Sequence, residues 1–132
     1  MSGGSVAFWY PGIPTGSNAG NRMRGRGAWH VVSRERGEVR EEMAPILRGI
    51  QESPGYTGPF PVAEIEATFC WTDRRKRDVP NFAESLKAII DSLRGVLLVD
   101  DDVAHLPRLV LGGVLGAEVK GIRIVVREVR EA

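Results

Sequence analysis

The chain has 132 residues, and its 18 Lys and Arg residues nearly balance its 17 Asp and Glu residues, for a formal net charge of +1. This length predicts one domain with a sizeable core over residues 1–132, with a flexible start at residues 1–5. The only cysteine, Cys70, excludes an internal disulfide framework. There is no apolar run of about 18 residues and no signal-peptide pattern, so we expect a cytoplasmic protein without a membrane partner.

The first half of the chain predicts a strand, a long loop and a helix. Val6–Tyr10 is a short apolar and aromatic run that a Pro-Gly pair stops, which is typical of a strand. Pro11–Gly27 is rich in Gly, Pro, Ser and Asn, which indicates a long loop. Ser33 can cap a helix whose apolar residues recur at helical spacing. Pro45 lies inside that pattern and predicts a kink or a break.

The second half predicts a strand, a helix and two further strands. Apolar and polar residues alternate over Ala63–Trp71, as in a strand with one buried face. Phe82–Leu93 has apolar residues at helical spacing. Two aliphatic runs, Leu109–Leu111 and Ile122–Val126, are separated by glycines and predict a closing antiparallel pair. The order β, α, β, α, β, β predicts an α+β fold with a small mixed or antiparallel sheet and helices packed on it.

Charged residues gather around the predicted second helix. Arg74–Arg77 is a run of four cations, in a chain whose other positive charges also occur in groups. On a helical wheel, Glu84, Lys87 and Asp91 share the polar side of the helix. An acidic triplet, Asp100–Asp102, follows the helix. Each feature taken alone is explained by solvated surface: a basic patch, a salt-bridged helix face and an acidic turn.

One cavity would give these features a common chemistry. The chain can turn back after the predicted helix and bring Asp78 to the triplet Asp100–Asp102. Carboxylates around one cavity repel each other unless a cation neutralises them, and hard oxygen ligands favour Mg²⁺ or Mn²⁺. Such a metal activates water at a phosphodiester, a lysine would offset negative charge, and arginines would hold flanking phosphates. The residues therefore indicate a metal-dependent phosphodiesterase acting on nucleic acid.

The same residues resemble the signature of the RusA-type Holliday-junction resolvases, a family common in phages and prophages. That signature is Arg-Asp-x-Asp-Asn, a Lys a few residues later, an Asp followed by a small residue and Leu, then an Asp-Asp pair. Here it reads Arg77-Asp78-Val79-Pro80-Asn81, Lys87, Asp91-Ser92-Leu93 and Asp100-Asp101-Asp102. Further matches over nearly the full chain are Ser17-Asn18 with Arg22, Gly25-Arg26, Val32-Ser33 with Arg40, and Lys120-Gly121.

The chain departs from the family pattern at two points. Pro80 stands where the family has its second aspartate, and proline cannot bind metal through its side chain. The spacing from Asn81 to Lys87 is also three residues longer than in the family pattern. A compensating carboxylate would be Asp102, or Glu84 on the polar side of the helix.

The resemblance implies a role for each residue of the signature. Asp78, Lys87 and Asp101 would be catalytic, with Lys87 as the cation that stabilises the phosphate. Asp91 would be a metal ligand or would orient one, unless it only pairs with Lys87 on the surface. Asn81 is a candidate DNA contact, although capping the helix suits it better. His30 and His105 are isolated, and we assign them no role. The full expected sets are Asp78, Asp91, Asp100, Asp101 and Asp102 for Mg²⁺ (or Mn²⁺), and Arg22, Arg24, Arg26, Arg74, Arg75, Lys76, Arg77 and Asn81 for DNA.

We therefore expect a Mg²⁺-dependent, structure-selective endodeoxyribonuclease that nicks Holliday junctions and other branched DNA, in recombination, repair or phage DNA processing. A homodimer is expected, because two matched cuts across a four-way junction need two equivalent sites about a twofold axis. No small-molecule cofactor is expected. One alternative is a flap or fork endonuclease that uses the same site. The other is a junction-binding protein that has lost cleavage through Pro80.

Overall fold

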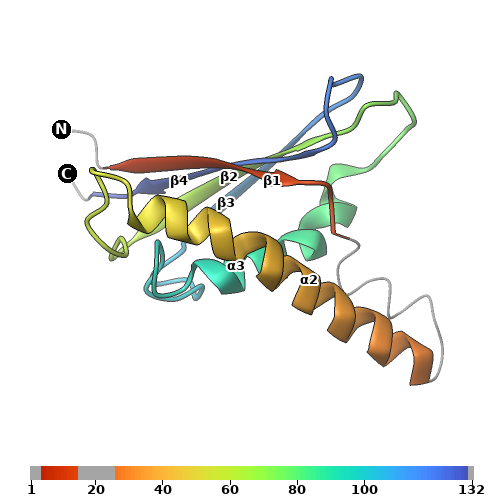
Figure 1. The fold of residues 1–132 in the computed structure, drawn as a ribbon. Coiled ribbons are helices and arrows are strands. Elements are labelled where there is room, and N and C mark those ends of the chain that lie inside the picture. The colour runs from red at the N-terminus through yellow and green to blue at the C-terminus, as the bar shows by residue number, and fades with distance from the viewer. Residues whose placement is uncertain (1–3, 15–25, 131–132) are drawn as a thin grey trace.

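The computed structural model describes residues 4–14 and 26–130, with side chains from residue 37 onward in the second range. One four-stranded mixed sheet carries the helices on one face and leaves the other face open (Figure 1). This architecture confirms the predicted α+β class. The elements are β1 (Ser5–Pro11), α2 (Arg26–Gln51), β2 (Ala63–Cys70), the 3₁₀-helix η1 (Val79–Leu86), α3 (Lys87–Leu93), β3 (Arg108–Val114) and β4 (Gly121–Glu128).

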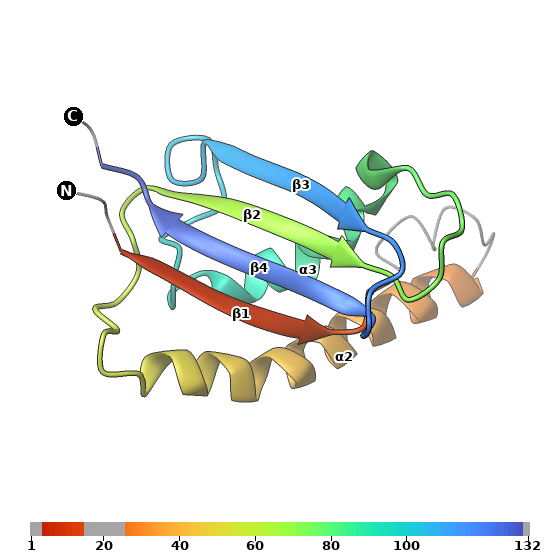
Figure 2. The same cartoon turned by 90° about the horizontal axis from the view of Figure 1, so that it is seen from above.

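The last strand of the chain lies in the middle of the sheet, whose order is β1-β4-β2-β3 (Figure 2). β4 pairs antiparallel with β1 and β2, while β2 pairs parallel with β3. The predicted antiparallel pairing of Leu109–Leu111 with Ile122–Val126 is therefore wrong, because β2 separates the two runs. Ile122, Ile124 and Val126 are almost fully buried, which suits a central strand, whereas β3 contains two adjacent glycines and lies at the edge.

The core lies between the sheet and the two α-helices. Along β2 every second residue, from Ala63 to Phe69, is buried against the helices, as the alternating pattern predicts. Met43 of α2 and Ile89 of α3 are fully buried on the other side of this interface. Leu97 and Leu98 after α3 are also fully buried, so the chain is anchored directly before the acidic triplet.

The long helix differs from the prediction at its start and at its proline. α2 begins at Arg26, so Ser33 lies inside the helix and does not cap it. The helix also continues through Pro45 to Gln51, so the expected break is absent. Pro45 has no N–H, so the carbonyl of Glu41, four residues earlier, has no helical hydrogen-bond donor. Both residues are exposed, so water can donate to that carbonyl.

The predicted second helix is two helices of different type. Val79–Leu86 forms the 3₁₀-helix η1, and only Lys87–Leu93 forms the α-helix α3. A 3₁₀-helix turns about 120° per residue instead of about 100°. The single helical wheel drawn from the sequence therefore misplaces Glu84, which lies in η1, but not Asp91, which lies with Lys87 in α3.

The beginning of the described chain is tied into the sheet. β1 starts at Ser5, and the carbonyl of Gly4 accepts a hydrogen bond of 2.8 Å from the backbone N–H of Glu128. Most of the predicted loop Pro11–Gly27, and the first three residues of the start expected to be flexible, lie outside the described residues. Within residues 4–14 and 26–130, no helix has both the length and the apolar character needed to cross a membrane.

Candidate functional site

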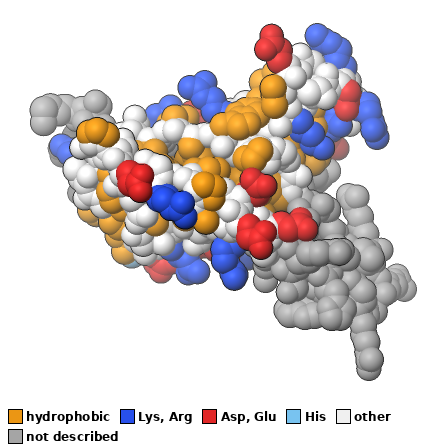
Figure 3. Space-filling model, in the orientation of Figure 1, with side chains coloured by type: hydrophobic (Ala, Val, Ile, Leu, Met, Phe, Trp, Pro, Cys, Tyr) orange, Lys and Arg blue, Asp and Glu red, His pale blue; other side chains and the backbone are white. Residues whose placement is uncertain are grey.

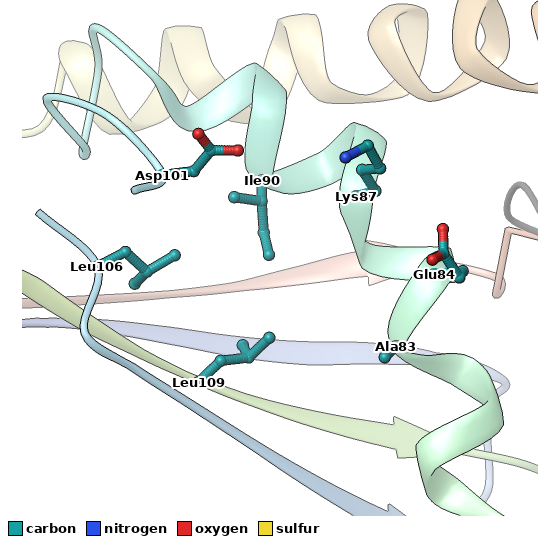
Figure 4. A pocket seen from close by; sticks show the side chains of 7 residues that line it. All are labelled: Ala83, Glu84, Lys87, Ile90, Asp101, Leu106 and Leu109. Atoms are coloured by element: carbon teal, nitrogen blue, oxygen red, sulfur yellow. The ribbon is translucent and has the colours of Figure 1, made fainter. Parts of the chain in front are cut away.

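A cavity of about 320 Å³ opens between η1, α3 and the loop that leads into β3 (Figure 4). Three charged side chains line it: Glu84 near the end of η1, Lys87 at the start of α3, and Asp101 from the loop between α3 and β3. The rest of its wall is apolar and consists of Ala83, Ile90, Leu106 and Leu109. All three charged side chains are exposed, so two carboxylates and one ammonium border one open space beside an apolar wall.

The backbone explains how the three charges come together. Residues three apart in a 3₁₀-helix point the same way, and Glu84 precedes Lys87 by three residues at the junction of η1 and α3. Figure 4 shows the Lys87 ammonium on the same side of the cavity as the Asp101 loop. The buried Leu97 and Leu98 fix the start of that loop, so the position of Asp101 depends on the core rather than on the surface alone.

The two neighbours of Asp101 form a separate turn with a histidine. The carboxylates of Asp100 and Asp102 and the imidazole of His105 offer ligand atoms that all lie within 4.8 Å of one another. Oδ1 of Asp102 lies 2.5 Å from Nδ1 of His105 and also accepts the backbone N–H of His105 at 3.1 Å. These hydrogen bonds lower the pKa of Asp102 from its ordinary value, with the imidazole contact as the main cause. Asp100 accepts the backbone N–H of Asp101 at 2.8 Å and so shapes the same turn.

His105 is the residue that the sequence reasoning missed. Within the described part of the chain, Asp100, Asp102 and His105 are the one group of three or more His, Cys, Asp or Glu residues close enough to share a metal ion. The available signal was the Asp-x-x-His spacing, which a single turn can close. The three-residue spacing from Asp102 to His105 therefore predicts that the histidine lies beside the acidic triplet.

Asp78 and Asp91, the other predicted ligands, lie elsewhere. Asp78 is the exposed N-cap residue of η1, its side chain makes no capping hydrogen bond, and it does not line the cavity. Asp91 is rotated about 40° from Lys87 on α3 and lines a different cavity, of about 480 Å³, with Arg40 and Arg94. The structure thus brings Lys87 to Asp101 and Glu84. It does not place Asp78 or Asp91 in that cavity.

Pro80 and Asn81 belong to the first turn of η1. Pro80 is the second residue of the helix, a position where proline is compatible with helix geometry. Asn81 is the third residue, and its backbone N–H donates to the carbonyl of Asp78 at 3.0 Å. The expectation that Asn81 caps the helix is therefore wrong, because Asp78 occupies the N-cap position.

Arg77 is held by the protein itself. Its guanidinium donates to both carboxylate oxygens of Asp73, one of them at 3.1 Å, and lies over the Trp71 ring at 5.0 Å from the centroid. The hydrogen bond from Arg77 is the main reason that the pKa of Asp73 is far below its ordinary value. The backbone N–H of Arg75 donates to the same carboxylate at 3.0 Å. Asp73 and Arg77 therefore shape the loop between β2 and η1.

The remaining cations of this loop are presented outward. Arg75 and Lys76 are exposed, and the guanidinium of Arg74 lies against Gly116 in the connection between β3 and β4. Figure 3 shows Lys and Arg side chains, with a few acidic ones, at the end of the molecule where this loop and this connection project. Arg22 and Arg24 lie outside the described residues, and Arg26 is described only as the first residue of α2.

The donor atoms around the acidic turn suit a divalent cation. Carboxylate oxygens, the ligands that Mg²⁺ and Mn²⁺ prefer, come from Glu84 and Asp101 at the cavity and from Asp100 and Asp102 in the turn. His105 adds an imidazole nitrogen, which is a ligand of transition metals more than of Mg²⁺. This chain lacks the second aspartate of the family pattern, because Pro80 stands in its place. Glu84 provides a carboxylate that could compensate for it.

Comparison with known proteins does not assign a family. No protein-family model matches the chain, and no curated protein matches it at a significant level. The resemblance to the RusA-type resolvases therefore stays a prediction that rests on the residues of the signature.

Proposed function

We propose that the protein is a metal-dependent endodeoxyribonuclease that nicks Holliday junctions and related branched DNA as a homodimer. The observation that carries this proposal is the cavity in which Lys87 lies with Glu84 and Asp101 against an apolar wall. A lysine and two carboxylates around one space are parts that metal-dependent phosphodiester hydrolysis uses.

Lys87 would stabilise the phosphate. Of the described residues that line the cavity, Lys87 alone is positively charged, and it is the first residue of α3. Negative charge builds up on the phosphate oxygens in the transition state, and a fixed ammonium beside them lowers the barrier. Ile90 and Leu109 form the apolar side of the cavity, and bound DNA would exclude more water from Lys87 and so strengthen this interaction.

The carboxylates would hold Mg²⁺ or Mn²⁺, which when bound supplies an activated water near neutral pH. Asp101 and Glu84 reach the cavity from two separate elements, so a bound cation would be fixed between backbones that the core already positions. Asp100 and Asp102 lie in the adjoining turn and would supply further oxygen ligands. Asp78 does not line this cavity, so it would have to bind the cation from outside it.

The exposed cations would bind DNA without reading its sequence. Arg75 and Lys76 project from the loop that Asp73 and Arg77 shape, and contacts of this type go to backbone phosphates. Specificity for branched DNA would then come from geometry. A twofold-symmetric dimer presents two equal sites, and a four-way junction offers two equivalent strands to cut.

The proposal is tested on a labelled four-way junction. The wild-type protein should nick it with Mg²⁺ or Mn²⁺ present, should not nick it in EDTA, and should leave a linear duplex of the same sequence intact. Asp101→Asn should abolish nicking and leave junction binding unchanged or tighter, because it removes repulsion between the carboxylate and phosphate. Glu118→Gln is the matched control, since Glu118 is an exposed acid outside the cavity. A flap or fork substrate that is cut in preference to the junction would favour the flap-nuclease alternative.

A second candidate is a junction-binding protein without cleavage. The observations that favour it are Pro80 in place of a ligand and the location of Asp78 outside the cavity. Junction binding without any metal-dependent nicking would select this candidate over the nuclease.

A further inference from the structure

The outer edge of β3 is free and apolar. β3 is the last strand of the sheet order and, within residues 4–14 and 26–130, pairs with β2 only, over Arg108–Val114. Leu109, Val110 and Val114 of this strand and the following Leu115 are each between 37% and 44% exposed. Edge strands in proteins usually carry charges, prolines or bulges that prevent pairing with another chain. From Leu109 to Val114 this edge carries no such protection.

The opposite edge of the sheet differs. β1 ends in Pro11, which has no N–H to donate to another strand. Figure 2 shows α2 running along the outside of β1, whereas among the described residues the outside of β3 is uncovered except near its end, where η1 projects past it. The open edge at β3 is thus the one able to extend the sheet.

In β3, two large apolar residues near the start of the strand, Leu109 and Val110, are followed by two glycines near its end. If two copies of β3 run antiparallel about a twofold axis at Leu111, Leu109 faces Gly113 of the second copy and Val110 faces Gly112. Leu109 and Val110 then each meet a glycine, Arg108 faces Val114, and Leu111 meets its own equivalent. Gly113 already lies beside Trp71 and Val79, which would come within 3.2 Å of a methyl group there. The space over Gly113 is thus already filled, and Leu109 of the second copy would pack against the edge of Trp71 and Val79 rather than over the glycine.

The charges at the two ends of β3 are complementary in the same arrangement. The acidic turn Asp100–Asp102 lies just before β3, and Arg74 lies against Gly116 just after it. Antiparallel pairing places the start of one β3 beside the end of the other. The acidic turn of each copy would thus approach Arg74 of the other.

We propose that two copies of the chain pair antiparallel through β3, with Leu111 on the twofold axis, to form one continuous eight-stranded sheet. The choice of a second copy as the occupant of this edge rests on the proposed function, which needs two equivalent sites. The register rests on the strand itself.

This pairing would complete each site with cations of the other copy. Within one copy, Leu109 lines the cavity while Gly116, where Arg74 lies, is seven residues further along the chain. At about 3.3 Å per residue, that separation is more than about 20 Å. Across the twofold axis the order is reversed, so the basic loop of the second copy flanks the cavity. A phosphate backbone held by one copy would then be cut by the other.

Cysteine cross-linking tests the register. Leu111→Cys is made in a Cys70→Ser background and oxidised. Facing residues of an antiparallel pair have Cα atoms about 4.5–5.5 Å apart, within the range of a disulfide. The expected product is a covalent dimer of twice 14.5 kDa, formed at least tenfold faster than from the control Val103→Cys. Val103 is 83% exposed but lies before β3 and away from the axis. Equal rates for the two variants would overturn the register.

Light scattering tests the interface without oxidation. Wild-type protein should have about twice the chain mass, Val110→Lys should be monomeric, and the control Val129→Lys, at an exposed residue after β4, should remain dimeric. The two lysines of a Val110→Lys dimer would be diagonal neighbours about 7–8 Å apart and would repel each other. Circular dichroism must show that both variants are folded. A Val110→Lys protein that stays dimeric overturns the proposal, as does a monomeric wild type.

The outcomes separate this inference from the proposed function. A wild-type protein that nicks junctions as a monomer would overturn the β3 pairing and retain the nuclease. A dimer that cross-links through Leu111 but never nicks would support the pairing and overturn the nuclease.

Discussion

Replacing Lys87 with methionine removes the positive charge of the cavity and keeps the length and helix propensity of the side chain. Lys87 is exposed and starts α3, so a solvated ion pair at this position is worth at most about 0.5 kcal/mol of unfolding free energy. At the reacting phosphate the expected effect is much larger. An electrostatic donor in a partly shielded site contributes roughly 100-fold or more to the rate, or about 2.7 kcal/mol of transition-state stabilisation.

The assay is single-turnover nicking of a labelled four-way junction at saturating protein, with binding measured separately by mobility shift without divalent metal. The Lys87→Met variant should bind the junction nearly as well as the wild type and nick it about 100-fold more slowly. Lys87→Arg should recover little activity, because a planar guanidinium does not occupy the position of an ammonium. Lys120→Met, at an exposed lysine outside the cavity, should behave like the wild type. A Lys87→Met protein that folds, binds and nicks normally would refute the role of Lys87.

Three further changes test other parts of the structure. Gly121→Ala should lower the unfolding free energy by about 1–3 kcal/mol in denaturant titrations, because a Cβ there would lie 2.2 Å from the Trp9 ring; unchanged stability would mean that Trp9 does not cover Gly121. Asp73→Asn should have a lower free energy of unfolding than the wild type near pH 7, and this difference should shrink as the pH falls below about 4. The reason is that folding lowers the pKa of Asp73, and protonation of its carboxylate removes the attraction to Arg77. A difference that does not change with pH would contradict this pairing. Arg75→Ala with Lys76→Ala should reduce the slope of log affinity against log salt by about 1–2 for every DNA shape, unlike Arg48→Ala on α2, and an unchanged slope would remove the loop from the DNA interface.

The fold class followed from local patterns, but the strand order did not. The alternation in β2 and the helical spacing in α2 depend on which face is buried, and both are visible in the sequence. The neighbours of β4 depend instead on which strand best tolerates burial on both edges. β4 takes the central position because it supplies three large side chains that are buried there, Ile122, Ile124 and Val126, whereas β3 has two glycines. Such a comparison involves all four strands and is not visible in any local pattern.

The candidate site was predicted in part, and the limit was the packing around α3, which separates Lys87 and Asp91 into two cavities. Lys87 and Asp101 were both singled out from the sequence, and the structure places them at one cavity. Asp91 was grouped with them because it lies four residues after Lys87 on the α-helix α3, but the rotation of about 40° between the two turns it towards Arg40 and Arg94 in another cavity. His105 escaped notice because a contact with Asp102 within a turn has no apolar periodicity to reveal it.

The central claim is that the cavity lined by Glu84, Lys87 and Asp101 cuts DNA with the aid of a divalent metal. The most direct measurement compares Mg²⁺-dependent nicking of one labelled four-way junction by wild-type, Glu84→Gln and Asp101→Asn proteins, each verified to be folded and to bind the junction. We predict symmetric nicks from the wild type and a loss of at least about 100-fold in rate for both variants. Nicking by both variants at the wild-type rate, or no nicking by the wild type at any concentration of Mg²⁺ or Mn²⁺, would contradict the claim.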